Sequence, residues 1–144
     1  MKNVITAMFL LAGVIACKQS VNYKTERDEV MKFHDIVMED QEKLTANQLK
    51  LDTLLKSLPA LKKQFRTMDT LKEKVNMLET QAKLNKAEGL MNQWMQQFEP
   101  DISGKSNDEA VRYFRAERVK IGVIDNIYRV EIKTSTNYLA RFYQ

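Results

Sequence analysis

The chain has few of the residues from which enzymes and disulfide-rich domains are built. Its 144 residues include one cysteine, one histidine, two prolines and four glycines. A single cysteine excludes a disulfide framework. The sequence also has no glycine-rich phosphate loop, no H-E-x-x-H motif and no carboxylate pair that spacing would single out as catalytic. This composition predicts a protein that is not an enzyme and holds no cofactor.

Charge is absent from one long stretch near the N-terminus. Lys2 precedes an uncharged, largely apolar run from residue 4 to residue 16, which ends on the small residue Ala16. This arrangement is typical of a secretory signal peptide. A membrane-spanning helix is the alternative, but it needs about 20 apolar residues, and this run is shorter and is closed by Lys18. We predict that residues 1 to 16 are removed as a signal peptide.

The four residues Val14-Ile15-Ala16-Cys17 resemble the lipobox that lipoprotein signal peptidase cuts. They combine a branched apolar residue, a tolerant position, a small residue and a cysteine whose thiol accepts a diacylglycerol. An ordinary buried cysteine that follows an alanine is the alternative, and it does not explain why all four positions match. We predict cleavage between Ala16 and Cys17 and a covalent lipid on Cys17. Residues 17 to 22 then form a lipidated, polar tether.

Lipidation determines where the protein works. Two or three acyl chains attach a protein stably to a membrane, so the predicted location is the cell envelope, at the outer membrane. The sequence leaves open whether the protein faces the periplasm or the cell surface.

A row of arginines, Arg112, Arg115 and Arg118, is better explained as a charged face than as a nucleic-acid site, because a lipoprotein outside the cytoplasm rarely meets nucleic acid.

The net charge is small and unevenly distributed. It is +4 for the whole chain, and the loss of Lys2 with the signal peptide leaves +3. Residues 22 to 57 hold six basic and eight acidic residues, whereas residues 108 to 143 hold seven basic and five acidic residues. This pattern favours an acidic first helix beside more basic neighbours over a dedicated anion-binding face.

Beyond the tether, apolar residues recur with a helical period that glycine and proline hardly interrupt. The first predicted helix opens with a loose capping box of Thr25 and Asp28 and ends at a turn within residues 57 to 70. A second begins with a capping box of Thr70 and Glu73, and the third with a capping box of Ser106 and Glu109. The predicted core of the second helix is Leu71, Val75, Leu78, Ala82, Leu90, Met91, Trp94, Met95 and Phe98.

These patterns predict an all-α fold in which residues 23 to 144 form an antiparallel three-helix bundle of long helices. The start of the first helix, the end of the second and the start of the third should then lie together at the membrane end. A long coiled coil between chains is the alternative. Gln41 and Gln48, at otherwise apolar positions, make it the weaker choice.

Three pieces of the sequence carry a resemblance to a known family. They are residues 34 to 38 (HDIVM), 87 to 95 (AEGLMNQWM) and 113 to 118 (YFRAER). The chain is similar to small Bacteroidetes-type helical lipoproteins, which are often labelled viral A-type inclusion proteins. The resemblance covers most of the chain after the signal peptide. It implies a lipobox and long helices, and it brings no established activity.

One cluster of residues suggests a ligand site. Met31, His34 and Met38 share a face of the first predicted helix, and Met91, Trp94 and Met95 share a face of the second. Thioether and imidazole groups suit Cu(I), and an indole ring can lie against a soft cation. Methionine and tryptophan at helical spacing are, however, more often part of a hydrophobic core. Whether the two groups meet depends on the turn: centred near residue 63 it would place residue 34 opposite about residue 93, near 58 opposite about 82, and near 68 opposite about 102.

Two classes of function follow. The first is a structural or interaction lipoprotein whose helices dock a protein partner in the envelope. The second is a binder of a soft metal or a small ligand, which would use the methionine, histidine and tryptophan cluster. We expect the first.

Overall fold

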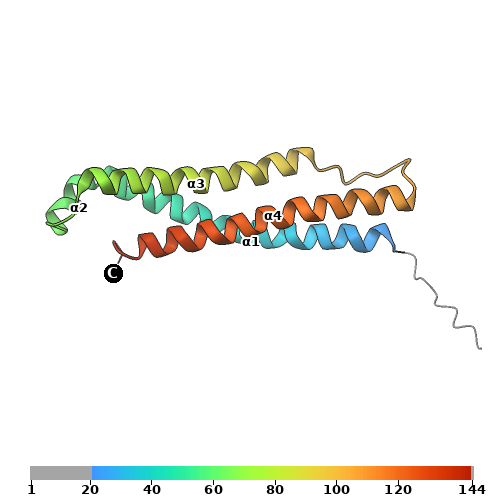
Figure 1. Ribbon diagram of the computed structural model, residues 1–144, viewed down its shortest axis with the longest axis horizontal. Helices are drawn as coiled ribbons and strands as arrows, with labels where there is room; N and C mark the ends of the chain where they lie inside the picture. Colours follow the sequence, from blue (N-terminus) through green and yellow to red (C-terminus); the bar gives the residue numbers. More distant parts are fainter. Residues whose placement is uncertain (1–20, 144) are drawn as a thin grey trace, which may run out of the picture.

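The structure is a computed structural model, and it describes residues 21 to 143. These residues form four helices and no strand, with α1 at Tyr23–Lys56, α2 at Leu58–Gln64, α3 at Thr70–Gln97 and α4 at Asn107–Leu139. The three long helices lie side by side, and the short α2 lies at the end where α1 turns back into α3 (Figure 1). The predicted all-α class is confirmed. The segment predicted only as a turn holds an additional helix.

The start of α1 differs from its prediction. Asn22 caps the helix, because its side-chain oxygen accepts a hydrogen bond from the backbone nitrogen of Lys24 at 3.0 Å. The predicted capping box of Thr25 and Asp28 is therefore wrong, since both residues lie inside α1. The helix ends at Lys56, ahead of Pro59, which lies in the first turn of α2, where its missing N–H costs nothing.

The two later helix starts are each fixed by a side chain. Asp69 caps α3 by accepting hydrogen bonds from the backbone nitrogens of Leu71 and Lys72, so the predicted cap at Thr70 is wrong by one residue. The capping box of Ser106 and Glu109 at the start of α4 is confirmed. Between these helices the loop 98 to 106 turns at Gly104, whose φ of 84° favours glycine.

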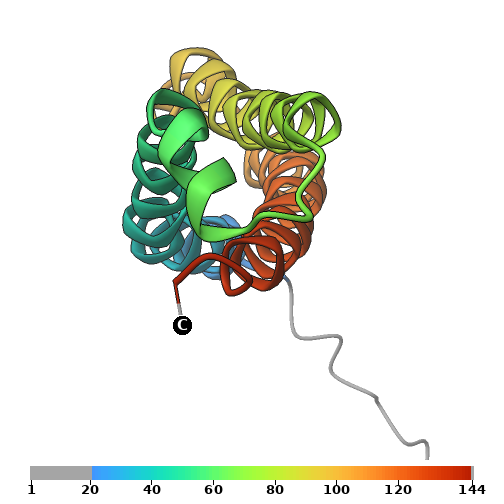
Figure 2. The same cartoon turned by 90° about the vertical axis from the view of Figure 1, so that its left-hand side faces the viewer.

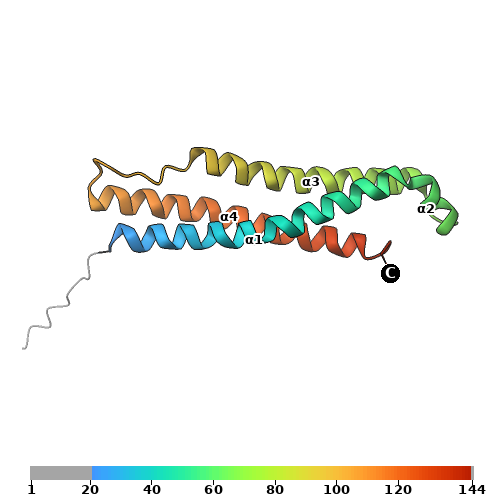
Figure 3. The ribbon, with the colours of Figure 1, turned by 180° about the vertical axis from the view of Figure 1, so that it is seen from behind.

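Contacts between the helices show their directions. Near the start of α4, Asn107 accepts a hydrogen bond from the backbone nitrogen of Tyr23, and further along Asn47 donates to Ser135 at 2.9 Å. The helices α1 and α4 are therefore parallel, and α3 runs against both, as the views from both sides show (Figures 1 and 3). As predicted, the start of α1, the end of α3 and the start of α4 lie at one end.

The core is an apolar seam that all three long helices share, and Figure 2 shows them arranged around a common centre. The seam between α1 and α4 is built from complementary aliphatic and aromatic side chains. The fully buried residues of the core as a whole include Val37, Leu44, Leu51, Met77, Leu84, Met91, Phe114, Ile121 and Tyr128.

The first half of α3 buries a different face from the one predicted, whereas Met91 and Trp94, which were also predicted as core, are buried. Leu71, Val75, Leu78 and Ala82 are exposed, with Leu71 78% accessible. The buried face instead runs through Glu73, Met77, Leu84, Ala87, Met91 and Trp94. Both faces have helical spacing, so periodicity alone did not separate them. The outer leucine and valine side chains thus form an apolar stripe on the surface.

Gln41 links all three long helices. Its amide nitrogen donates to Glu88 on α3 at 3.1 Å, and its amide oxygen accepts from the hydroxyl of Tyr128 on α4 at 2.6 Å. Burial and the nearby Glu88 carboxylate raise the pKa of Tyr128 to about 12, so it remains a donor at neutral pH. A polar residue in the seam is therefore satisfied by specific partners, which favours one alignment of the helices.

Candidate functional site

The predicted anchor lies outside the described residues. This holds for the signal peptide, for cleavage at Ala16 and for the lipid on Cys17. Val21 is the first described residue, and its carbonyl accepts a hydrogen bond from Asn107 at 3.0 Å. None of the helices in residues 21 to 143 is long and apolar enough to cross a membrane.

The residues of the predicted soft-metal cluster lie in one half of the bundle, but some of them are buried and others are exposed. The rings of His34 and Trp94 are 6.2 Å apart, as a turn centred near residue 63 predicts. Met91 is buried with Trp94, whereas Met31, Met38 and Met95 are 36%, 41% and 40% exposed. The imidazole Nδ1 of His34 is 3.0 Å from a carboxylate oxygen of Asp35. Within the described part of the chain, no three His, Cys, Asp or Glu side chains gather as metal ligands.

Aromatic side chains fill the interior of this end. Trp94 stacks on Phe98 with 4.7 Å between ring centroids, and Phe98 contacts Phe114 at 6.3 Å. Phe114 in turn contacts Tyr113 and Tyr23. Phe114 therefore joins Trp94 and Phe98 through aromatic packing, in which edge and face contacts add to the burial of apolar area.

A hydrophobic groove of about 440 Å³ lies between α3 and α4. Its two walls come from antiparallel helices and are mainly aliphatic. Val119 and Val123 on α4 are 66% and 55% exposed there. The apolar lining is completed by Leu90, Trp94, Ile124 and Ile127. A groove of this kind accepts the apolar face of another helix.

The charges at this groove are paired. Lys120 is the one charged residue in the lining, and its ammonium is 2.7 Å from a carboxylate oxygen of Glu117. Arg129, further along α4, is 2.9 Å from a carboxylate oxygen of the buried Asp125. The groove therefore combines an apolar floor with a polar edge at which the charge of Lys120 is balanced.

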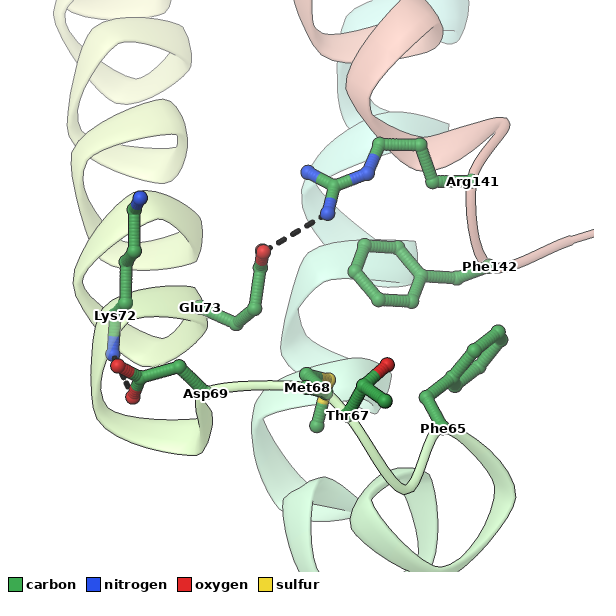
Figure 4. Close-up of a pocket in the computed structure, with 8 residues that line it drawn as sticks. All are labelled: Phe65, Thr67, Met68, Asp69, Lys72, Glu73, Arg141 and Phe142. Carbon is green, nitrogen blue, oxygen red and sulfur yellow. Dashed lines mark hydrogen bonds and ion pairs between the residues drawn. The ribbon is translucent and has the colours of Figure 1, made fainter.

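A second, more polar pocket lies at the opposite end of the molecule. It has a volume of about 390 Å³ and lies between the start of α3 and the end of the chain. Figure 4 shows Phe65 and Phe142 on one side, Asp69 on the other, and Arg141 directed toward Glu73. Phe65 and Phe142 meet edge to face at 5.8 Å. The pocket therefore lies at the end of the bundle where α3 begins and the chain ends.

Glu73 is the electrostatic centre of this pocket. Its carboxylate accepts a 2.7 Å hydrogen bond from Tyr138 and a 2.8 Å hydrogen bond from Arg141. Burial by itself would raise the pKa of Glu73, but these two donors outweigh it and hold the pKa below its usual value. The Arg141 guanidinium also lies over the rings of Tyr138 and Phe142. These contacts fasten α3 to the end of α4.

Neither hollow was predicted from the sequence. The groove could have been suspected, because Val119, Val123, Ile127 and Val130 repeat at helical spacing along α4. No motif indicates the pocket.

Comparisons with protein-family models, with characterised proteins and with solved structures find no match to this chain. The resemblance to the helical lipoproteins stays a prediction.

Proposed function

We propose that this protein is a lipid-anchored envelope protein whose bundle of three long helices is an interaction module. The proposal includes the cleaved signal peptide at residues 1 to 16, the lipid on Cys17 and a location at the outer membrane. The single observation that supports the interaction role is the exposed apolar groove between α3 and α4. Exposed apolar patches of this kind mark interaction sites, because covering them releases water from apolar surface.

The anchor is tested by metabolic labelling with an alkyne fatty acid. We expect the wild-type chain to carry the label and the Cys17→Ser variant to lose it and remain uncleaved. Cys17 is the only cysteine, so no other thiol can accept the lipid. A labelled Cys17→Ser chain would contradict the anchor.

The interaction role is tested by placing a photo-crosslinking amino acid at Val123, in the groove, and at Asn137, an exposed position elsewhere on α4. Irradiation of intact cells should yield a crosslinked protein species of defined mass from position 123 and none from position 137. Equal labelling at both positions, or none at either, would contradict a specific interaction surface.

A further inference from the structure

The outer face of α3 carries an apolar stripe that no other described helix covers. Leu71, Val75, Leu78 and Ala82 are all exposed, and Val75 and Leu78 are 52% and 47% accessible. We call these four residues the α3 stripe. At 3.6 residues per turn they point away from the face of α3 that buries Met77. The stripe is therefore available to another molecule.

The α3 stripe has the spacing of a coiled-coil seam. Its members are separated by four, three and four residues, which is the heptad pattern of positions d, a, d and a. Leucine occupies both d positions and the β-branched Val75 occupies an a position, a combination that favours two parallel helices. Beyond Ala82 the next seam positions hold Asn85 and Gly89, so the apolar seam ends after two heptads.

The charges beside the stripe fit a parallel pair of identical helices. In such a pair, the g position of one helix faces the e position five residues later on the other helix. Lys74 is at g and Glu79 is at e, so each copy places a lysine against a glutamate of the other. Both side chains are exposed, and neither takes part in an ion pair within residues 21 to 143. The next pair of this kind, Gln81 and Lys86, brings no like charges together.

The stripe lies too far from the start of the described chain to be covered by the residues before it. Gln48 on α1 bonds to Asn85 on α3, so the stripe is level with the second half of α1. This is about 40 Å from Asn22 at 1.5 Å per residue. After the proposed cleavage, residues 17 to 20 reach at most about 14 Å when fully extended. Cover for the stripe therefore comes from a second molecule.

We infer that the α3 stripe binds the same stripe of a second copy of this chain, as a parallel two-helix seam. The inference rests on the proposed lipid anchor, because anchors at the same end hold two copies parallel and at equal height. Each seam residue then meets its own counterpart, and the contact is two-fold symmetric and closes as a dimer. Anchoring also raises the effective concentration, which a seam of only two heptads needs. The groove between α3 and α4 stays free for another protein.

The first test is disulfide crosslinking in membranes that contain the full-length lipidated protein. Lipidation blocks Cys17, so an introduced cysteine is the only free thiol. Val75→Cys alone and Leu78→Cys alone should each give a dimer and nothing larger under mild oxidation, because a faces a and d faces d in a parallel pair. Val123→Cys, at an exposed position in the groove, is the matched control and should give no dimer.

Two outcomes of this test would overturn the inference. In an antiparallel pair, Val75 faces Leu78 of the other copy, so a mixture of the two variants would crosslink while each alone would not. A dimer yield at Val123→Cys equal to that at Leu78→Cys would show that crosslinking reflects random collision.

The second test reverses charge beside the seam in the Leu78→Cys chain. Lys74→Glu or Glu79→Lys should each lower the dimer yield by about fivefold or more, because like charges then face one another at two places in the dimer. Both changes in one chain should restore the yield, since the same pairs form with their signs exchanged. Lys133→Glu, at an exposed position on α4, is the matched control and should leave the yield unchanged. A yield insensitive to both single reversals would contradict the parallel seam.

The lipid label is measured in the same samples, which separates the two proposals. A labelled protein that gives no dimer from Val75→Cys or Leu78→Cys would contradict self-association and leave the anchor intact. An unlabelled protein would contradict the anchor, and with it the parallel arrangement that the inference requires.

Discussion

The indole nitrogen of Trp94 on α3 donates a 2.9 Å hydrogen bond to the carboxylate of Glu117 on α4. Both side chains are buried, and the second carboxylate oxygen is 2.7 Å from the ammonium of Lys120. The indole N–H of Trp94 and the carboxylate of Glu117 thus each have a hydrogen-bond partner although both side chains are buried. A buried donor that loses its acceptor keeps its full desolvation cost.

Replacing Glu117 with methionine should lower the free energy of unfolding by about 1 to 3 kcal/mol, because the Trp94 N–H loses its acceptor. Glu117→Gln keeps an acceptor oxygen and should cost less. Urea unfolding followed by circular dichroism and by the fluorescence of Trp94, the only tryptophan, measures both changes. Exposed Glu79→Gln is the control. Equal stability of Glu117→Met and wild type would show that the bond adds nothing.

Glu73 should make stability depend on pH. Its pKa is lower in the folded chain than in the unfolded chain, so its stabilising contribution is complete above the unfolded value and is lost as pH falls through the folded value. We expect Glu73→Gln to destabilise the protein at pH 7 by about 1 to 3 kcal/mol, as for a charged hydrogen bond. The difference from wild type should shrink as pH falls through the lowered pKa of Glu73 in the folded chain. Denaturation curves from pH 3 to pH 7 test this. A difference that stays constant with pH would contradict it.

Asp125, unlike Glu73, is a buried carboxylate of which only one oxygen has a partner. Its Oδ2 is 2.9 Å from Arg129, but its Oδ1 has no hydrogen-bond partner among residues 21 to 143. Arg129 is largely exposed and can return to water if the carboxylate is removed. Asp125→Leu should therefore stabilise the protein, by about 1 kcal/mol, because buried ion pairs are often no better than apolar packing. A lower midpoint of urea unfolding than wild type would refute this.

His34 distinguishes the core interpretation from the soft-metal interpretation. Its one hydrogen bond is to the exposed Asp35, so little is lost when the imidazole is removed. We expect His34→Leu to keep the stability of the wild type within about 1 kcal/mol. We also expect no binding of Cu(I) that depends on His34. Titration of the full chain with Cu(I), followed by Trp94 fluorescence, measures this. Micromolar binding that disappears in His34→Leu would favour the metal site.

The sequence was informative where a local pattern determines the structure. The capping box of Ser106 and Glu109 and the stop ahead of Pro59 need only neighbouring residues, and both are present. The face of α3 could not be chosen in this way. Burial of Glu73 becomes favourable only because Tyr138 and Arg141, more than sixty residues away, supply donors. A charged residue in the buried face therefore made the exposed face look like the better core.

The candidate site depended even more on contacts between distant segments. The pairing of His34 with Trp94 could be predicted only conditionally, because it requires a turn centred near residue 63 and the sequence places the turn anywhere within residues 57 to 70. The groove could at most be suspected from the spacing of Val119 and Val123, since it depends on which faces of α3 and α4 the other described helices leave uncovered. Periodicity identifies apolar faces, but it does not tell which of them a partner helix covers.

The two hydrogen bonds of the Asn107 side chain affect how the bundle responds to a pulling force. The side chain accepts a hydrogen bond from the backbone nitrogen of Tyr23 and donates one to the carbonyl of Val21, so it holds the residues on both sides of the α1 cap, Asn22. A pull that arrives through the preceding residues is therefore shared between α1 and α4 at their first turns. Because these helices are parallel, the load acts along their common seam and shears many side-chain contacts at once. Such a bundle resists tension better than one whose first helix could be peeled away turn by turn.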